Sequence, residues 1–333
     1  MSDIGSSRHS MHRVVVVGGA GFIGAHFVDT LLGMDDIERV RVYDNFSSGR
    51  RWHLERHVND DRFDVVPDDV RDLEALTTAL VGFDTIIHLA SNPDIAAAVS
   101  NPLIDFDQGT LLTQNVVEAM RRSSCDLVLY ASGSGVYGDL GEREGTEDYG
   151  PLVPESTYGA SKLAGEALIA SYCYMFGMRG RSFRFANVVG PRQTHGVGYD
   201  FVRQLLADPS RLNVLGDGHQ SKSYIHVNDV IAAVLTAARA PVDPFSTFNV
   251  ATTDYITVRE IADLAIKTVV GDTLSTSTHF AGGKRGWKGD VPIVRLNTDR
   301  IRTLGWNNSL NTREALRLSL ESLLQDFRSG KIG

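Results

Sequence analysis

Short apolar runs alternate with helix-period segments along the first half of the chain. Runs of four or five apolar residues rich in β-branched side chains favour strands, and apolar positions three and four residues apart favour helices. This pattern predicts strands at Arg13–Val17, Arg39–Tyr43, Phe63–Val66, Thr85–Ala90, Leu127–Ala131 and Gly180–Phe185. It predicts helices at Phe22–Leu32, Leu73–Leu80, Leu111–Arg121 and Lys162–Met175. Strands and helices that alternate in this way form right-handed βαβ units and a parallel sheet.

The second half of the chain is less regular. From about Gly196 the loops lengthen, and we predict only two further helices, Val258–Val270 and Thr312–Phe327. The pattern therefore predicts an α/β protein with a Rossmann-type, doubly wound parallel sheet and a smaller C-terminal substrate-binding domain. The expected division is a disordered tail at 1–10, a Rossmann-type dinucleotide-binding domain at 11–187, and a mainly substrate-binding domain at 188–333 that is interleaved with the first.

Composition excludes several classes of function. The 333 residues are 42% hydrophobic and 22% charged, as in ordinary globular proteins, and the net charge of −8 argues against nucleic acid or an anionic membrane as partner. No apolar run is long enough to span a bilayer, and the polar first ten residues do not resemble a signal peptide. Cys125 and Cys173 lack metal-ligand spacing and indicate free thiols. We therefore expect a cytoplasmic protein without a metal site.

A glycine-rich turn joins the first predicted strand to the first predicted helix. Gly18 permits a tight bend, Gly21 lets a pyrophosphate approach the backbone, and Gly24 allows close packing of the helix on the sheet. The helix N-terminus then offers free N–H groups to the anion. Asp44 ends the second strand, where a carboxylate would accept hydrogen bonds from the adenosine ribose and repel a 2′-phosphate. The predicted cofactor is therefore NAD rather than NADP.

Tyr158 and Lys162 form a Y-x-x-x-K pair at the start of a predicted helix, with both side chains on one face. A tyrosine with a pKa of about 10 is a weak base at neutral pH. A lysine ammonium one turn away, together with the positive nicotinamide ring of NAD, would favour the phenolate. Behind a dinucleotide-binding turn, this pair indicates proton transfer by Tyr158 in an NAD-dependent reaction.

Together these motifs resemble the extended short-chain dehydrogenases/reductases, and specifically the nucleotide-sugar epimerase/dehydratase family. The resemblance extends from about Arg13 to near the C-terminus. Besides Tyr158 and Lys162, it rests on the segments 18–24, 44–49, 69–72, 88–90, 131–138, 187–192 and 224–230. It implies that Tyr158 removes a proton from a sugar hydroxyl while hydride passes from that carbon to NAD. It also implies a homodimer formed through the helices that contain Leu111 and Lys162.

The resemblance further implies which residues contact the ligands. The expected NAD contacts are Gly18, Gly21, Phe22, Ile23, Gly24, Asp44, Asn45, Ser47, Ser48, Gly49, Asp69, Val70, Leu89, Ala90, Ser91, Ala131, Tyr158, Lys162, Phe185 and Val188. The expected contacts to a UDP-sugar substrate are Ser132, Ser134, Tyr158, Asn187, Arg192, Lys222 and Arg285.

The segment before Tyr137 distinguishes the reactions of this family. Similar 4,6-dehydratases carry an acidic pair there, and related uronate decarboxylases carry a Thr and a Glu, whereas residues 132–135 of this chain include no carboxyl group. Gly133 replaces the usual catalytic Ser or Thr, so that either Ser132 or Ser134 must hydrogen bond to the reacting hydroxyl. This favours a 4-epimerase, in which hydride leaves carbon 4, the 4-keto sugar turns about its diphosphate, and hydride returns to the other face.

Arg192 bears on the identity of the sugar. It lies in the loop that resembles the family's sugar-facing segment, and a guanidinium can bind a carboxylate through two hydrogen bonds. This favours the interconversion of UDP-glucuronate and UDP-galacturonate, although Arg192 could equally bind the diphosphate or support the fold. A UDP-glucose 4-epimerase is the nearest alternative. A UDP-glucuronate decarboxylase and a non-catalytic NAD-sensing protein are further alternatives.

Overall fold

The central sheet has seven parallel strands in the order β11-β6-β5-β4-β1-β2-β3. The computed structural model describes residues 11–241, 243–272 and 274–332, so that the tail predicted at 1–10 lies outside the described residues. The strands are β1 (Arg13–Val17), β2 (Arg39–Tyr43), β3 (Phe63–Val66), β4 (Thr85–His88), β5 (Leu127–Gly133), β6 (Arg179–Phe185) and β11 (Phe245–Val250). The predicted α/β class and Rossmann-type sheet are confirmed, because this order reverses between β1 and β4 as in dinucleotide-binding sheets.

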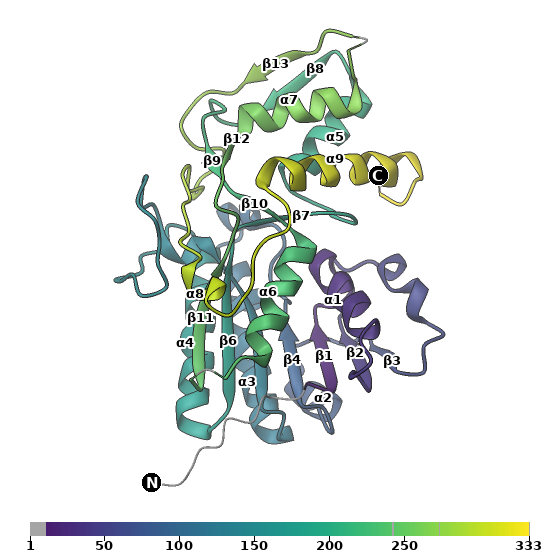
Figure 1. The fold of residues 1–333 in the computed structure, drawn as a ribbon, viewed down its shortest axis with the longest axis vertical. Coiled ribbons are helices and arrows are strands. Elements are labelled where there is room, and N and C mark those ends of the chain that lie inside the picture. Colours follow the sequence, from purple (N-terminus) through teal and green to yellow (C-terminus); the bar gives the residue numbers. More distant parts are fainter. Residues whose placement is uncertain (1–10, 242, 273, 333) are drawn as a thin grey trace.

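Helices cover both faces of the sheet (Figure 1). One face packs against α1 (Phe22–Leu32) and α6 (Val227–Arg239), and the other against α2 (Leu73–Ala79), α3 (Leu111–Ser123) and α4 (Thr157–Phe176). Burial on both faces explains the unbroken run of valines in β1. Val14 and Val16 belong to the hydrophobic core that includes α1 and α6, and Val15 and Val17 belong to the core that includes α2, α3 and α4. A strand that is buried on both faces has no polar side to alternate with.

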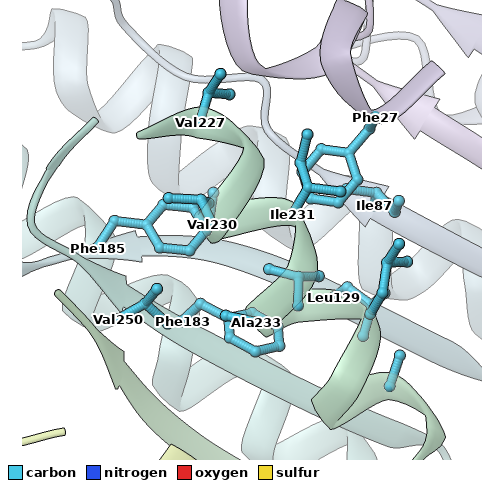
Figure 2. Close-up of a cluster of buried hydrophobic side chains, with 14 of the residues drawn as sticks. Phe27, Ile87, Leu129, Phe183, Phe185, Val227, Val230, Ile231, Ala233 and Val250 are labelled. Atoms are coloured by element: carbon cyan, nitrogen blue, oxygen red, sulfur yellow. The ribbon is translucent and has the colours of Figure 1, made fainter. Parts of the chain in front are cut away.

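Helix α6 was missed by the sequence analysis, which expected lengthening loops after Gly196. Figure 2 shows Val230, Ile231 and Ala233 of this helix packed against Phe183 and neighbouring residues of the sheet. Its buried apolar residues Val227, Val230, Ile231, Val234, Leu235 and Ala238 are three and four residues apart, which is the spacing of a helix with one apolar face. The sequence therefore carried a signal for this helix, and the error matters because α6 contributes a large part of the core.

The rest of the C-terminal half lies beyond the carboxyl ends of the sheet strands (Figure 1). Three helices, α5 (Val197–Ala207), α7 (Val258–Val269) and α9 (Thr312–Arg328), enclose a separate hydrophobic core. Short strands complete it in three pairs, β8 (Arg211–Val214) with β13 (Ser277–Phe280), β7 (Asn187–Val189) with β10 (Tyr224–His226), and β9 (Ser221–Lys222) with β12 (Ile256–Thr257). The one-turn helix α8 (Asp299–Arg302) follows these pairs. The chain therefore returns to the sheet twice after residue 187, through α6 and β11.

Truncation of Val230 tests the role of α6 in stability. We expect Val230→Ala to lower the free energy of unfolding by about 2 kcal/mol, because it removes buried methyl groups and leaves a cavity. Urea unfolding measures the change. Val81→Ala is the matched control, since Val81 is 66% exposed, and it should change stability by less than about 0.5 kcal/mol. Equal effects of the two substitutions would contradict the packing described for α6.

Candidate active site

A cleft of about 660 Å³ opens at the carboxyl ends of the sheet strands and reaches into the C-terminal half. Such a position, at the point where strand order reverses, is where open α/β sheets bind ligands. The structure brings every predicted cofactor and substrate residue to this cleft except Gly49, Arg192 and Arg285. Sequence motifs far apart in the chain therefore converge on one site.

The glycine-rich turn forms one wall of the cleft. Gly18 has φ +82°, and a Cβ atom there would lie 2.7 Å from the backbone nitrogen of Ala90. A Cβ on Gly24 would lie 2.4 Å from the carbonyl oxygen of Gly18, so that only glycine lets α1 approach the turn. Gly21 caps α1 without any side-chain hydrogen bond, which leaves backbone N–H groups for an anion. These features fit the pyrophosphate of NAD.

Asp44 lies at the end of β2 and is 8% exposed. Its carboxylate accepts hydrogen bonds from the N–H groups of Ala20 (2.9 Å) and Phe46 (2.8 Å). Burial raises the pKa of Asp44, and the two N–H groups oppose this effect. Gly49 lies behind the carboxylate, since a Cβ there would be 2.8 Å from Oδ1 of Asp44. The expected cofactor contact from Gly49 is therefore not found in the cleft. Its role is to leave room for Asp44.

The adenosine end of the cleft is rich in polar contacts. Asn45 donates a hydrogen bond to Asp69 (2.8 Å), whose carboxylate is also paired with Arg71 (2.7 Å). The guanidinium of Arg71 holds the pKa of Asp69 well below its usual range. Asp69 is therefore an ionised acceptor beside Val70, and both residues are expected NAD contacts that line the cleft.

Helix α4 begins at Thr157, earlier than the predicted start at Lys162, because the Ser156 hydroxyl accepts a hydrogen bond from the N–H of Gly159 and caps the helix. Tyr158 thus lies in the first turn and Lys162 in the second. Lys162 is 3% exposed, and its Nζ donates a hydrogen bond to the carbonyl of Ala131 (2.8 Å). The same Nζ lies 5.4 Å from the centroid of the Tyr158 ring.

Burial acts on both groups in the direction that favours their neutral forms. It raises the pKa of Tyr158 to about 12 and lowers the pKa of Lys162 to about 8. A hydrogen bond from Ser91 opposes the rise in the pKa of Tyr158. In the protein alone, Tyr158 is therefore protonated at neutral pH, and it becomes a base only with added positive charge nearby.

Asp105 is a buried carboxylate beside the catalytic pair that the sequence analysis missed. It is 1% exposed and accepts hydrogen bonds from the hydroxyl of Thr157 (2.6 Å) and the amide of Asn92 (2.9 Å). Its negative charge raises the pKa of both Tyr158 and Lys162. No motif marks a single acid before a helix, so the sequence carried no clear signal for it.

The two candidate serines differ in their environment. Ser132 is buried, and its hydroxyl donates a hydrogen bond to Glu166 (2.6 Å), which is ion-paired with Arg184 (2.8 Å). Ser134 lines the cleft and makes no side-chain hydrogen bond to another described residue. A Cβ on Gly133 would meet nothing within 4 Å. The position of the family's usual Ser or Thr is therefore open space in this chain.

Asn187 and Lys222 line the cleft on its substrate side. Lys222 is ion-paired with Asp290 (2.6 Å), and the amide of Asn187 donates a hydrogen bond to the carbonyl of Ser223 (3.2 Å). Arg285 does not line the cleft, contrary to expectation. It is paired with Glu155 (2.5 Å) and Asp139 (3.4 Å), so its charge is already neutralised by carboxylates near the rim.

Arg192 also lies outside the cleft, although the residues that follow it line the cleft. Its guanidinium is ion-paired with Asp29 of α1 and donates a hydrogen bond to the carbonyl of His53 (3.3 Å). The guanidinium expected to bind a substrate carboxylate is therefore paired with a carboxylate of the protein itself. Asp29 and Arg192 are 163 positions apart in the chain, so the sequence analysis could not predict this pair.

The fold and the cleft define an NAD-binding enzyme of the nucleotide-sugar type, and comparisons agree. Residues 14–251 match the model of the NAD dependent epimerase/dehydratase family. The UDP-glucose 4-epimerase of Mycolicibacterium smegmatis is 33% identical over 93% of this chain and 97% of its own length. The chain therefore belongs to the NAD-dependent epimerase/dehydratase family, and its cofactor is NAD.

Solved structures extend these comparisons. A UDP-galactose 4-epimerase is 34% identical, with a TM-score of 0.83, and the match covers 94% of this chain and 99% of the other. MoeE5, solved in complex with UDP-glucuronic acid and NAD, is 25% identical, with a TM-score of 0.82 and the same coverage. Similarity thus includes proteins that act on or bind different UDP-sugars.

Within residues 11–241, 243–272 and 274–332, no helix is long and apolar enough to cross a membrane. The same residues contain no cluster of three or more His, Cys, Asp or Glu side chains that could hold a metal ion. The homodimer and the cytoplasmic location stay predictions.

The catalytic pair predicts a bell-shaped pH profile for turnover of a nucleotide sugar. The rate should rise with pH on the acid side, because Tyr158 must lose its proton to act as a base. It should fall above about pH 8, because Lys162 then loses the charge that favours the phenolate. Steady-state kcat against pH measures both limbs. Lys162→Met should be much slower and lack the alkaline limb, and an unchanged alkaline limb in this variant would contradict the assignment.

Proposed function

We propose that this protein is an NAD-dependent UDP-sugar 4-epimerase. The observation that carries the proposal is the pairing of every carboxylate that lines the described cleft. These pairs are Asp44 and Asp68 with backbone N–H groups, Asp69 with Arg71, Glu155 with Arg285, and Asp290 with Lys222. Elimination of water from a sugar needs a carboxylic acid free to protonate the leaving hydroxyl. Epimerisation at carbon 4 needs only a group that removes a proton and returns it.

Tyr158 can do this work with the residues around it. Its phenolate would accept the proton of the 4-hydroxyl, and Lys162, held by the carbonyl of Ala131, would stabilise that phenolate by its charge. Bound NAD supplies the hydride acceptor for carbon 4 and then the hydride donor. After the keto sugar has turned, Tyr158 returns the proton to the new 4-hydroxyl. The sugar keeps all its atoms, so the net reaction is an isomerisation.

Ser134 is the hydroxyl that we assign to the 4-position of the sugar. Ser132 already donates its proton to Glu166, whereas Ser134 faces the cleft without a partner among the described residues. The turn that carries Ser134 lies directly against the first turn of α4, since a Cβ on Gly159 would be 2.5 Å from the carbonyl oxygen of Gly135. Ser134 is therefore close to Tyr158 and can orient the hydroxyl that Tyr158 deprotonates.

UDP-glucose and UDP-galactose are the first candidate substrates. The main sequence argument for a uronate was Arg192, and its guanidinium is paired with Asp29 instead. The 4-epimerases that are 33% and 34% identical also support this choice. UDP-glucuronate and UDP-galacturonate are the second candidates. They are supported by the similarity to MoeE5 and by the polar side chains of Thr194 and His195, which line the cleft.

Incubation of the purified protein with each UDP-sugar tests the proposal. We expect conversion of UDP-glucose into UDP-galactose, or of UDP-glucuronate into UDP-galacturonate, with no net consumption of NAD. NMR of the mixture identifies the products. Tyr158→Phe should lose activity by a factor of about 10² to 10⁴ and still bind NAD, because only the proton transfer is removed. Formation of UDP-xylose and CO2, or of a 4-keto-6-deoxy sugar, would contradict epimerisation. No turnover of any nucleotide sugar would favour an NAD-sensing role.

Paired serine substitutions test the role of Ser134. Ser134→Ala should lower kcat roughly 10- to 100-fold, with little change in stability, through loss of a hydrogen bond to the reacting hydroxyl. Ser132→Ala should mainly reduce stability, since it removes a buried partner of Glu166. Because the space beside Gly133 is open, Gly133→Ser in the Ser134→Ala background should restore part of the rate. A larger loss of kcat in Ser132→Ala than in Ser134→Ala would overturn the assignment.

A further inference from the structure

The loop from Gly190 to Gly196 joins two parts of the site. At its beginning it contacts α1, the helix that opens at the pyrophosphate turn. The ring Nε2 of His26 donates a hydrogen bond to the carbonyl of Pro191 (2.9 Å), and the Arg192 side chain is paired with Asp29. At its end, Gln193, Thr194 and His195 line the substrate side of the cleft. The loop is therefore anchored to the helix that begins at the cofactor site, and its end forms part of the wall of the substrate site.

A second path leads from Arg192 to the pyrophosphate turn itself. The guanidinium donates a hydrogen bond to the carbonyl of His53, at the end of the short helix η1 (Arg51–His53). The ring Nδ1 of His53 donates in turn to the carbonyl of Ala20, within the turn (2.8 Å). Burial lowers the pKa of His53 to about 4 and that of His26 to about 3, so both rings are neutral donors at physiological pH.

The backbone and the burial of Arg192 indicate that these contacts are firmly held. Arg192 has φ +65°, a conformation that residues other than glycine adopt where their surroundings hold them. Its side chain is 14% exposed and that of Asp29 is 18% exposed. Removal of Asp29 would leave the mostly buried guanidinium of Arg192 without this carboxylate, whereas removal of Arg192 would leave Asp29 in contact with Arg56 and His57. The pair therefore constrains the loop strongly.

We propose that Arg192 is a positioning residue that couples the NAD site to the substrate site. Its ion pair with Asp29 sets the loop Gly190–Gly196 relative to the pyrophosphate turn. A ligand that contacts Gln193, Thr194 or His195 then favours the turn in its NAD-binding arrangement, and the effect is reciprocal. Arg192 does so without contact to either ligand. The inference rests on the proposed function only in the experiments that measure turnover of a UDP-sugar. The experiments that measure NAD exchange do not depend on it.

Exchange of bound NAD measures the coupling directly. The holoenzyme is mixed with labelled NAD, and the exchange rate is recorded with and without saturating UDP. We expect UDP to slow exchange at least about fivefold in the unmodified protein. In Arg192→Met this factor should fall towards one, and exchange without UDP should be faster. Arg192→Lys, which can still pair with Asp29, should lie between the two and guards against a variant that fails to fold.

Two further variants make the test specific to the ion pair. Asp29→Asn should reproduce the effect of Arg192→Met, and the double variant should be no worse than either single one. Arg56→Met is the matched control, since Arg56 is paired with the same carboxylate but is 57% exposed and, among the described residues, forms no hydrogen bond to the backbone of the loop. It should leave both NAD exchange and the effect of UDP unchanged.

The outcomes separate this inference from the proposed function. A positioning role predicts that Arg192→Met lowers kcat/KM for UDP-glucose and UDP-glucuronate alike. Loss for UDP-glucuronate alone, with the effect of UDP on NAD exchange intact, would overturn the inference and make Arg192 a substrate-binding residue. An unmodified protein without turnover on either sugar would refute the proposed function, yet NAD exchange would still test the coupling. An unchanged effect of UDP in Arg192→Met would refute the coupling itself.

Discussion

The contact between Gly18 and the backbone of Ala90 is the constraint on which the site depends. The two residues follow β1 and β4, the neighbouring strands between which the strand order reverses. The two loops lie so close together here that no side chain would fit between them. They diverge only beyond this point. The start of α1 and the ends of β2 and β5 are placed relative to this contact. Lys162 is hydrogen bonded to Ala131 near the end of β5, so the catalytic pair is held to the same edge of the sheet.

A buried polar network supports the substrate side of that edge. Glu166 accepts hydrogen bonds from Ser132 and Arg184, and Arg184 also donates to the hydroxyl of Tyr137 (2.9 Å). Such a network is stabilising only when all its members are paired, because an unpaired buried charge is costly. Here the network holds the segment between β5 and Tyr137 in place through the buried side chains of Ser132 and Tyr137. The open position at Gly133 and the hydroxyl of Ser134, which has no partner among the described residues, therefore adjoin a fully hydrogen-bonded network.

Local motifs made the cofactor site predictable. The turn after β1, Asp44 at the end of β2, and the spacing of Tyr158 and Lys162 each depend on residues near one another in the chain, and the structure brings them together. Long-range pairs could not be predicted in this way. Asp105 acts on Tyr158 from another helix, and Arg192 is paired with a residue of α1. Helix α6 is a different case, since its apolar residues recur at helical spacing and the sequence could have predicted it. The sequence could thus predict which chemistry is present, but not which side chains are free to perform it.

The central claim is that one sugar carbon loses its hydrogen and receives the same hydrogen back. The most direct test uses holoenzyme, ordinary water and UDP-glucose, or UDP-glucuronate if that is the sugar turned over, carrying deuterium at carbon 4. NMR then locates the label in both epimers at equilibrium. Transient oxidation by enzyme-bound NAD predicts that the deuterium remains at carbon 4 in substrate and product. Replacement of the label by hydrogen from water would contradict transient oxidation at carbon 4 by enzyme-bound NAD.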